Sequence, residues 1–356
     1  TQIDSDLGIA LRPHASGYNL KEGEAHIVIN SNGFRDKEFS IAKKPNTIRI
    51  AVLGDSFTEA RQVEAKERFT SILETELQKC SMTEEIDVEV MNFGVSGYGT
   101  DQEYIQLKRD VLPYKPDIVL LILFTGNDVF NNYAGFASNA NKPFFSVIDD
   151  NLVLDTSFKE SKFFMSQNTM SSRVLGSVIN RSRILQLLNK FRNIIRTRSA
   201  TKKEVIEDAD INNYLDVGLA YSTYKQPVDE DWKKAWDISD ALLVAMHEAV
   251  TQEGAIFITG ILGTSVEWHF DAAVRSRVLE YLEIENFNYP TDRVKRLARE
   301  NKFTVISSIN STLRQHAESI QLPLDKHANG TSGHINTAGH AIIGTTLATN
   351  LCSYIK

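Results

Sequence analysis

The chain has 356 residues, which is long for one minimal domain and short for two large ones. Its 42% hydrophobic and 24% charged residues are typical of an ordinary globular protein. The formal net charge of −7 argues against general binding to nucleic acid phosphates, and no apolar run approaches the roughly 18 residues of a membrane-spanning helix. Because the chain begins with Thr1 rather than Met, we expect a processed or trimmed chain, compatible with a removed signal peptide or anchor.

The first 45 residues combine short β-like pieces with turns. Gly, Pro and Asn punctuate this segment, 26–29 has the composition of a strand, and 30–36 has that of a turn. We predict that 1–45 is an N-terminal extension that packs on the main domain.

After residue 45, compact apolar runs alternate with helical patterns. Helices are predicted over 68–79, from Thr100 onward and over 336–351. The alternation predicts an α/β fold, a doubly wound parallel sheet with helices on both faces, whose core comprises 46–129 and 254–356. The runs typical of buried parallel strands cover 48–53, 88–93, 117–124, 255–260 and 304–306.

A long segment, 130–253, interrupts this alternation between the third and fourth strands. We predict that it is a mainly helical insertion, with helices over 177–198 and 229–251, that forms a cap near the ligand-binding edge of the sheet. The helix over 177–198 has a basic polar face that is compatible with an anionic membrane surface. Packing on the core with a solvated basic face is the favoured interpretation, because most amphipathic surface helices pack in this way.

Three short motifs directly follow the first three predicted strands. They are Gly54-Asp55-Ser56, the stretch Asn-Phe-Gly-Val-Ser-Gly over 92–97, and Gly126-Asn127-Asp128. Ligands of doubly wound sheets bind beyond the carboxyl ends of the strands, so all three motifs are expected at the ligand-binding edge.

The serine of the first motif is a candidate nucleophile. A serine hydroxyl needs an adjacent base. His334, at the start of the predicted last helix, is expected at the same edge and is the candidate general base. Taken alone, Ser56 also fits a helix N-cap.

Gly97 and Asn127 are candidates for an oxyanion hole. The backbone N–H groups of Ser56 and Gly97 and the side-chain amide of Asn127 are donors of the kind that stabilise the charged oxygen of a tetrahedral intermediate. Gly97 alone also fits a tight loop, and Asn127 alone fits a turn cap. Their expected convergence on one edge favours the catalytic interpretation.

These motifs resemble those of the SGNH hydrolases of the GDSL esterase superfamily. The similarity covers about 46–128 and 254–352, and it extends to a bacterial branch associated with cell-envelope polysaccharides. It implies a flavodoxin-like sheet and hydrolysis or transfer of acyl esters, with no metal and no cofactor. It also implies Ser56 as nucleophile, His334 as base, and an oxyanion hole formed by Ser56, Gly97 and Asn127.

One feature departs from the family pattern, which places an aspartate two or three residues before the histidine. Here those positions hold Ser332 and Thr331. The acid normally orients the imidazole and stabilises the imidazolium. Three explanations stay open: Ser332 or a backbone carbonyl orients His334, Asp325 reaches in across a longer loop, or the site is impaired.

The two cysteines follow predicted helices that are neighbours in a flavodoxin-like order. Cys80 ends the first of these helices and Cys352 the last, and the two helices run in the same direction. A disulfide between them is one hypothesis, and two buried thiols are the alternative.

We therefore expect a serine ester hydrolase, with a carbohydrate O-acetyl ester as one candidate substrate. An O-acyltransferase with the same site is an alternative, as is an impaired binding protein of the same fold. The expected partner is a small-molecule or glycan acyl ester. From the family resemblance and the cysteines, a periplasmic, secreted or membrane-anchored location is favoured over a cytoplasmic one.

Overall fold

The computed structural model describes the whole chain except residues 81–85, 137–140, 170–171, 173–213, 216–218 and 356. The helix predicted over 177–198 lies outside the described residues. Among those that are described, no helix combines the length and apolarity needed to cross a bilayer.

The centre of the molecule is a parallel sheet of five strands in the order β11-β10-β7-β5-β6. All seven residues of the central strand β7 are buried, as expected of a strand covered on both faces. The predicted strands are all present, with bounds β5 Thr47–Leu53, β6 Asp87–Asn92, β7 Ile118–Phe124, β10 Ile256–Leu262 and β11 Thr304–Ile306. This is the doubly wound, flavodoxin-like α/β fold that the alternation of elements predicts.

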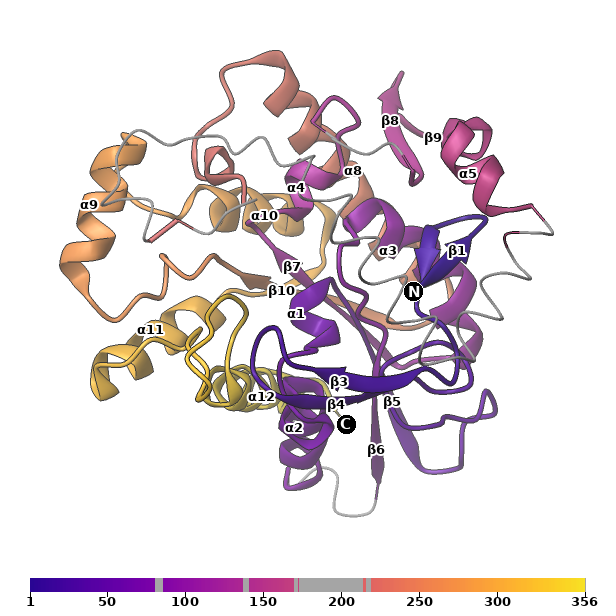
Figure 1. Ribbon diagram of the computed structural model, residues 1–356, viewed down its shortest axis with the longest axis horizontal. Coiled ribbons are helices and arrows are strands. Elements are labelled where there is room, and N and C mark those ends of the chain that lie inside the picture. The colour runs from indigo at the N-terminus through magenta and orange to yellow at the C-terminus, as the bar shows by residue number, and fades with distance from the viewer. Residues whose placement is uncertain (81–85, 137–140, 170–171, 173–213, 216–218, 356) are drawn as a thin grey trace.

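Two groups of helices cover the two faces of the sheet (Figure 1). One hydrophobic cluster joins a sheet face to α2 (Phe69–Gln78), α11 (Ile309–Ile320) and α12 (Thr337–Leu351). A second cluster joins the opposite face to the segment after α3 (Thr100–Gln106) and to α10 (Tyr289–Asn301) and α8 (Glu230–Gln252). Alternate residues of β5 show the division, because Ile50 and Val52 belong to the first cluster and Ala51 and Leu53 to the second.

Helix α8 shows how the segment 130–253 relates to the core. Asp229 caps its N-terminus through Trp232 N, and Leu243, Met246 and Val250 are buried with the residues of the sheet. This helix follows β7 and precedes β10 in the chain, and it covers one face of the sheet. We had predicted it within a cap. The remaining described elements of the segment are α4 Asp128–Asn131, β8 Phe144–Ile148, β9 Asn151–Asp155, α5 Lys162–Gln167 and two short 3-10 helices, Ser157–Glu160 and Tyr221–Tyr224.

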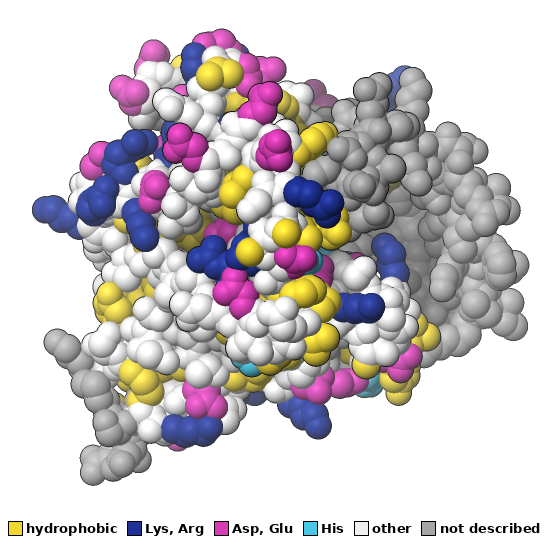
Figure 2. All heavy atoms as spheres, turned by 90° about the vertical axis from the view of Figure 1, so that its left-hand side faces the viewer, with side chains coloured by type: hydrophobic (Ala, Val, Ile, Leu, Met, Phe, Trp, Pro, Cys, Tyr) yellow, Lys and Arg dark blue, Asp and Glu magenta, His cyan; other side chains and the backbone are white. Residues whose placement is uncertain are grey.

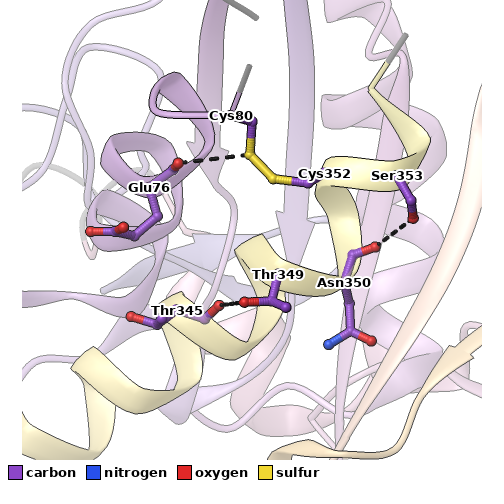
Figure 3. Close-up of a disulfide and its surroundings, with 7 residues drawn as sticks. All are labelled: Glu76, Cys80, Thr345, Thr349, Asn350, Cys352 and Ser353. Atoms are coloured by element: carbon purple, nitrogen blue, oxygen red, sulfur yellow. Dashed lines mark hydrogen bonds between the residues drawn. A yellow bond between two sulfur atoms is a disulfide. The ribbon is translucent and has the colours of Figure 1, made fainter. Parts of the chain in front are cut away.

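Cys80 and Cys352 are joined by a disulfide (Figure 3). Their Cα atoms lie 6.2 Å apart, just beyond the C-terminal ends of α2 and α12. The structure thus contains the cross-link that the helix order suggested. It ties together two helices that are already packed side by side on one face of the sheet.

The N-terminal residues form two small antiparallel hairpins. β1 (Gln2–Asp4) pairs with β2 (Gly8–Ala10), and β3 (Ser16–Asn19) pairs with β4 (Ala25–Val28). The tip of the second hairpin, residues 20–24, is called the hairpin tip below.

On the face shown in Figure 2, acidic and basic side chains are interspersed. Two further α-helices of the described residues are α1 Ser56–Glu59 and α9 Ala272–Leu282.

Candidate active site

Ser56 lies at the sharp turn between β5 and the short helix α1. The N-cap of that helix is Asp55, whose Oδ1 accepts a hydrogen bond from Phe57 N at 2.9 Å. A Cβ on Gly54, which has φ +153°, would lie 2.2 Å from Thr58 Oγ1, so the turn requires glycine. Because Asp55 performs the capping, and its Oδ2 lies as far as 3.5 Å from Ser56 Oγ, the hydroxyl of Ser56 can bond to a closer partner.

That partner is the imidazole of His334. The Ser56 Oγ and His334 Nε2 atoms are 2.8 Å apart, within hydrogen-bonding distance. His334 stands in the loop before α12, whose N-cap Asn336 accepts from Gly339 N at 3.0 Å. The structure therefore brings the predicted nucleophile and the predicted base together, although 278 positions separate them.

The second ring nitrogen of His334 contacts Glu22, a residue that sequence reasoning missed. Glu22 Oε2 is 2.5 Å from His334 Nδ1 and also accepts from the backbone N of His334 at 3.3 Å. With Nδ1–H donating to Glu22, Nε2 is free to accept the Ser56 O–H. Ser56, His334 and Glu22 thus form the hydrogen-bonded series of a Ser-His-acid triad.

The hairpin tip that carries Glu22 is fixed to the loop that carries His334. Gly23 N donates to Thr331 Oγ1 at 3.0 Å, and Asn329 Nδ2 donates to Gly23 O at 3.1 Å. At the base of the tip, Asn19 Nδ2 donates to Glu22 O at 2.7 Å. These hydrogen bonds fix the backbone of Glu22 and Gly23 and so position the Glu22 carboxylate.

Two glycines allow this close approach. A Cβ on Gly23 would lie 2.2 Å from Gln62 O, and a Cβ on Gly333 would lie 2.6 Å from Glu22 Oε1. Both glycines have positive φ, +57° and +144° respectively, a backbone conformation that residues with a side chain rarely adopt. Glycine at position 333 thus leaves the space that the Glu22 carboxylate occupies.

None of the three explanations offered for the missing acid describes this site. The contact to His334 Nδ1 comes from the N-terminal segment, and not from Ser332. Asp325 contributes its backbone O, which accepts from Gly333 N at 3.2 Å. The expectation of an impaired site also loses its basis, because a carboxylate does contact the imidazole.

The pKa shifts of His334 and Glu22 agree with a hydrogen bond from His334 Nδ1–H to an ionised Glu22. Burial by itself lowers the pKa of His334, but the hydrogen bond and charge of Glu22, together with the charge of Asp55, raise it above its usual value. The hydrogen bond to His334 lowers the pKa of Glu22. The pair therefore favours a carboxylate beside an imidazole that readily accepts a proton.

The predicted oxyanion donors lie on loops at the same edge of the sheet. Asn127 Nδ2 donates to Asp55 Oδ2 at 3.0 Å, which leaves the second amide hydrogen for another acceptor. Gly97 has φ +86° in the loop after β6, and a Cβ there would meet nothing within 4 Å. Val95 N in that loop donates to Gly54 O at 3.1 Å, beside the nucleophile turn. The roles of Ser56, Gly97 and Asn127 as oxyanion donors stay a prediction.

A small polar cavity opens onto Ser56 and His334. Its volume is about 130 Å³. All the residues that line it are polar or charged: Asn19, Lys21, Glu22, Ser56, Arg61, Gln62, Ser96 and His334. Across the described part of the chain, no cluster of three or more His, Cys, Asp or Glu side chains is arranged to bind a metal ion.

A flavodoxin-like sheet with a Ser-His-acid series at its carboxyl edge has an arrangement suited to ester hydrolysis. The model of the GDSL-like lipase/acylhydrolase family matches residues 52–273, and the chain belongs to this family. It is an ester-bond hydrolase.

Two of the solved structures that resemble this chain come from bacteria. Axe2, an acetylxylan esterase from Geobacillus stearothermophilus, is 12% identical with a TM-score of 0.42, and the match covers 85% of this chain and 94% of Axe2. A putative lipolytic protein of the G-D-S-L family from Desulfitobacterium hafniense DCB-2 is 13% identical with a TM-score of 0.37, covering 85% and 98%. No curated protein sequence matches.

Proposed function

We propose that the protein hydrolyses small O-acyl esters of polar alcohols, such as O-acetyl groups on carbohydrates, through an acyl-enzyme on Ser56. The observation that carries this proposal is the continuous series Ser56 Oγ–His334 Nε2 at 2.8 Å and His334 Nδ1–Glu22 Oε2 at 2.5 Å. The cavity of about 130 Å³ suits a short acyl group. The polar and charged side chains that line it favour a polar alcohol over a long hydrocarbon chain.

The reaction proceeds in two halves. Ser56 Oγ attacks the ester carbonyl carbon while its proton passes to His334 Nε2, and the carbonyl oxygen becomes the oxyanion. The imidazolium, stabilised by Glu22, then protonates the leaving alcohol as the bond from the carbonyl carbon to the alcohol oxygen breaks. Water attacks the acyl-enzyme with His334 again as base, which releases the acid and restores Ser56.

Labelling with a fluorophosphonate probe tests the nucleophile, and acetate release from acetylated sugars tests the substrate. We expect the parent protein to be labelled and Ser56→Ala to be unlabelled and inactive. Ser311→Ala is a matched control, because Ser311 bonds within α11 to Ser308 O at 2.9 Å. An unlabelled and inactive parent, or labelling retained in Ser56→Ala, would contradict the proposal.

A further inference from the structure

Two cationic side chains line the cavity without a hydrogen-bonding partner among the described residues. They are Lys21, on the hairpin tip, and Arg61, which follows α1. The nearest ionic contact of Arg61 is to Glu59, at 3.8 Å from Nε to Oε1, which is too long for a hydrogen bond. The side chain of Arg61 is 53% exposed, so its N–H donors are available to a ligand.

The backbone that carries Arg61 is nevertheless held firmly. The guanidinium of the buried Arg35 donates to the carbonyl oxygens of Glu59 at 2.9 Å and Val63 at 2.6 Å, and to that of Ala60. Gln62 is also buried, and its Nε2 donates to Ile335 O at 2.9 Å. The segment is thus fixed on both sides of Arg61, while the Arg61 side chain itself projects to the cavity.

Lys21 shows the same arrangement. The hydrogen bonds of Asn19 to Glu22 O and of Gly23 to Thr331 fix the hairpin tip on both sides of it. The lysine side chain is exposed and lines the cavity. Two separate segments, each rigidly held, therefore direct a positive charge to the rim of one cavity.

The charge balance of the cavity is opposite to that of the chain. Lys21 and Arg61 outnumber Glu22, which is already engaged with His334, whereas the whole chain has a formal charge of −7. Glu59 lies beneath Arg61 and is only 2% exposed, and its Oε2 accepts from Ser96 N at 2.7 Å. At the cavity surface the charged groups without a hydrogen-bonded partner among the described residues are therefore the two cations.

The position of Arg61 also carries an electrostatic disadvantage for catalysis. Its charge opposes protonation and so acts to lower the pKa of His334. An anion bound between the two cations would neutralise them and favour the imidazolium formed during the reaction. The guanidinium is suited to bidentate binding of a carboxylate.

We propose that Lys21 and Arg61 bind a carboxylate on the alcohol part of the ester, so that the preferred substrates are O-acyl esters of acidic sugars. The cavity accommodates the small acyl group, and the cations at its exposed rim meet the alcohol part. This inference rests on the proposed function, because it concerns the alcohol bound at the same site.

A matched pair of substrates tests the inference. Acetate release is measured from a mono-O-acetylated methyl galactoside and from the methyl glycoside of galacturonic acid acetylated at the same hydroxyl, in which a free carboxylate replaces the C6 hydroxymethyl group. We expect a higher kcat/KM for the galacturonate ester. We also expect Arg61→Gln and Lys21→Gln each to reduce the ratio of the two kcat/KM values about threefold to tenfold. Added salt is expected to reduce the ratio as well.

Exposed cations on helices that do not line the cavity provide controls with the same change of charge. Lys234→Gln on α8 and Arg296→Gln on α10 are expected to leave the ratio unchanged. Equal kcat/KM values for the two esters, or a ratio unaffected by Arg61→Gln and Lys21→Gln, would overturn the inference and leave the proposed function standing. Failure to hydrolyse either ester, without fluorophosphonate labelling, would overturn the proposed function itself.

Discussion

Glu22 Oε2 lies 2.5 Å from Nδ1 of His334, although 312 positions separate the two residues in the chain. The carboxylate is delivered by an N-terminal hairpin, and the histidine precedes the last helix. The segment 1–45, which the sequence presents as an extension, therefore contributes a side chain to the candidate active site.

Replacing Glu22 tests its effect on the imidazole. We expect Glu22→Gln to lower kcat by up to about 10⁴-fold, because the amide does not stabilise the imidazolium. Glu22 raises the pKa of His334, and the base acts in its neutral form, so activity falls as pH decreases through that pKa. Without Glu22 this acid limb is expected to move to lower pH, as measured in a profile of kcat/KM against pH.

Glu22→Asp is the conservative control for this variant. The shorter side chain keeps the charge, so we expect partial recovery of kcat and of the acid limb. If Glu22→Gln kept the parent pH profile and rate, Glu22 would have no positioning role.

Gly333 offers an independent test of the same contact. A Cβ at this position would lie 2.6 Å from Glu22 Oε1, so Gly333→Ala is expected to displace the carboxylate and reproduce the rate loss of Glu22→Gln. Gly330→Ala is the control, because Gly330 also has positive φ, +83°, but its Cβ would meet nothing within 4 Å. Equal losses of kcat in the two variants would show that backbone strain in the loop, and not displacement of the Glu22 carboxylate, lowers the rate.

Asn127 is predicted to stabilise the oxyanion. Asn127→Ala removes the amide that Asp55 holds at 3.0 Å, and we expect kcat to fall about 10²- to 10³-fold with a smaller change in KM. Asn131→Ala, in the short helix α4 that Asn127 precedes, is the control. A change confined to KM would argue for a binding role instead.

Glu103 is expected to make stability decrease with increasing pH. It is fully buried, neither carboxyl oxygen has a hydrogen-bonding partner among the described residues, and burial and the charges of Asp55 and Asp101 raise its pKa. The folded protein then keeps a proton that the unfolded chain releases above about pH 4.3. The unfolding free energy therefore falls as pH rises from there through the raised pKa.

Glu103→Gln is expected to remove this dependence. Thermal denaturation measures the melting temperature of the variant minus that of the parent protein. This difference should increase between pH 5 and pH 8. Glu300→Gln, at an exposed position near the end of α10, should follow the parent curve. Parallel curves for Glu103→Gln and the parent would show that Glu103 does not titrate differently in the folded state.

The Cys80–Cys352 cross-link is expected to stabilise the fold by about 2–5 kcal/mol, because it restricts the unfolded chain across a separation of 272 residues. A reductant should lower the unfolding midpoint of the parent protein. It should leave that of the double variant Cys80→Ser/Cys352→Ser unchanged. An identical midpoint for the oxidised parent and the double variant would contradict a stabilising role.

The sheet could be predicted from sequence because local patterns determine it. The seven buried residues of β7 form an uninterrupted apolar run, and strand-end motifs mark where Ser56 and Asn127 must lie. Helix α8 was predicted almost to the residue, but its assignment to a cap was not met, because periodicity identifies a buried face and not the surface that covers it.

The position of Glu22 could not be predicted in the same way. It depends on how a hairpin docks through Gly23, Thr331 and Asn329, and no local pattern encodes that docking. The nearest signals were the Glu-Gly pair at 22–23, just before the β-like piece 26–29, and the glycine at 333 before the histidine. Each is common in turns, and only their spatial contact connects them.

The separation of Glu22 and His334 along the chain also affects when the site is completed during synthesis. A ribosome adds the imidazole 312 positions after the carboxylate and 278 positions after the Ser56 hydroxyl, so a nascent chain holds the candidate nucleophile without its base over that span of translation. The series Ser56–His334–Glu22 can form only after the loop that carries His334 has been made and the hairpin that carries Glu22 has docked against it.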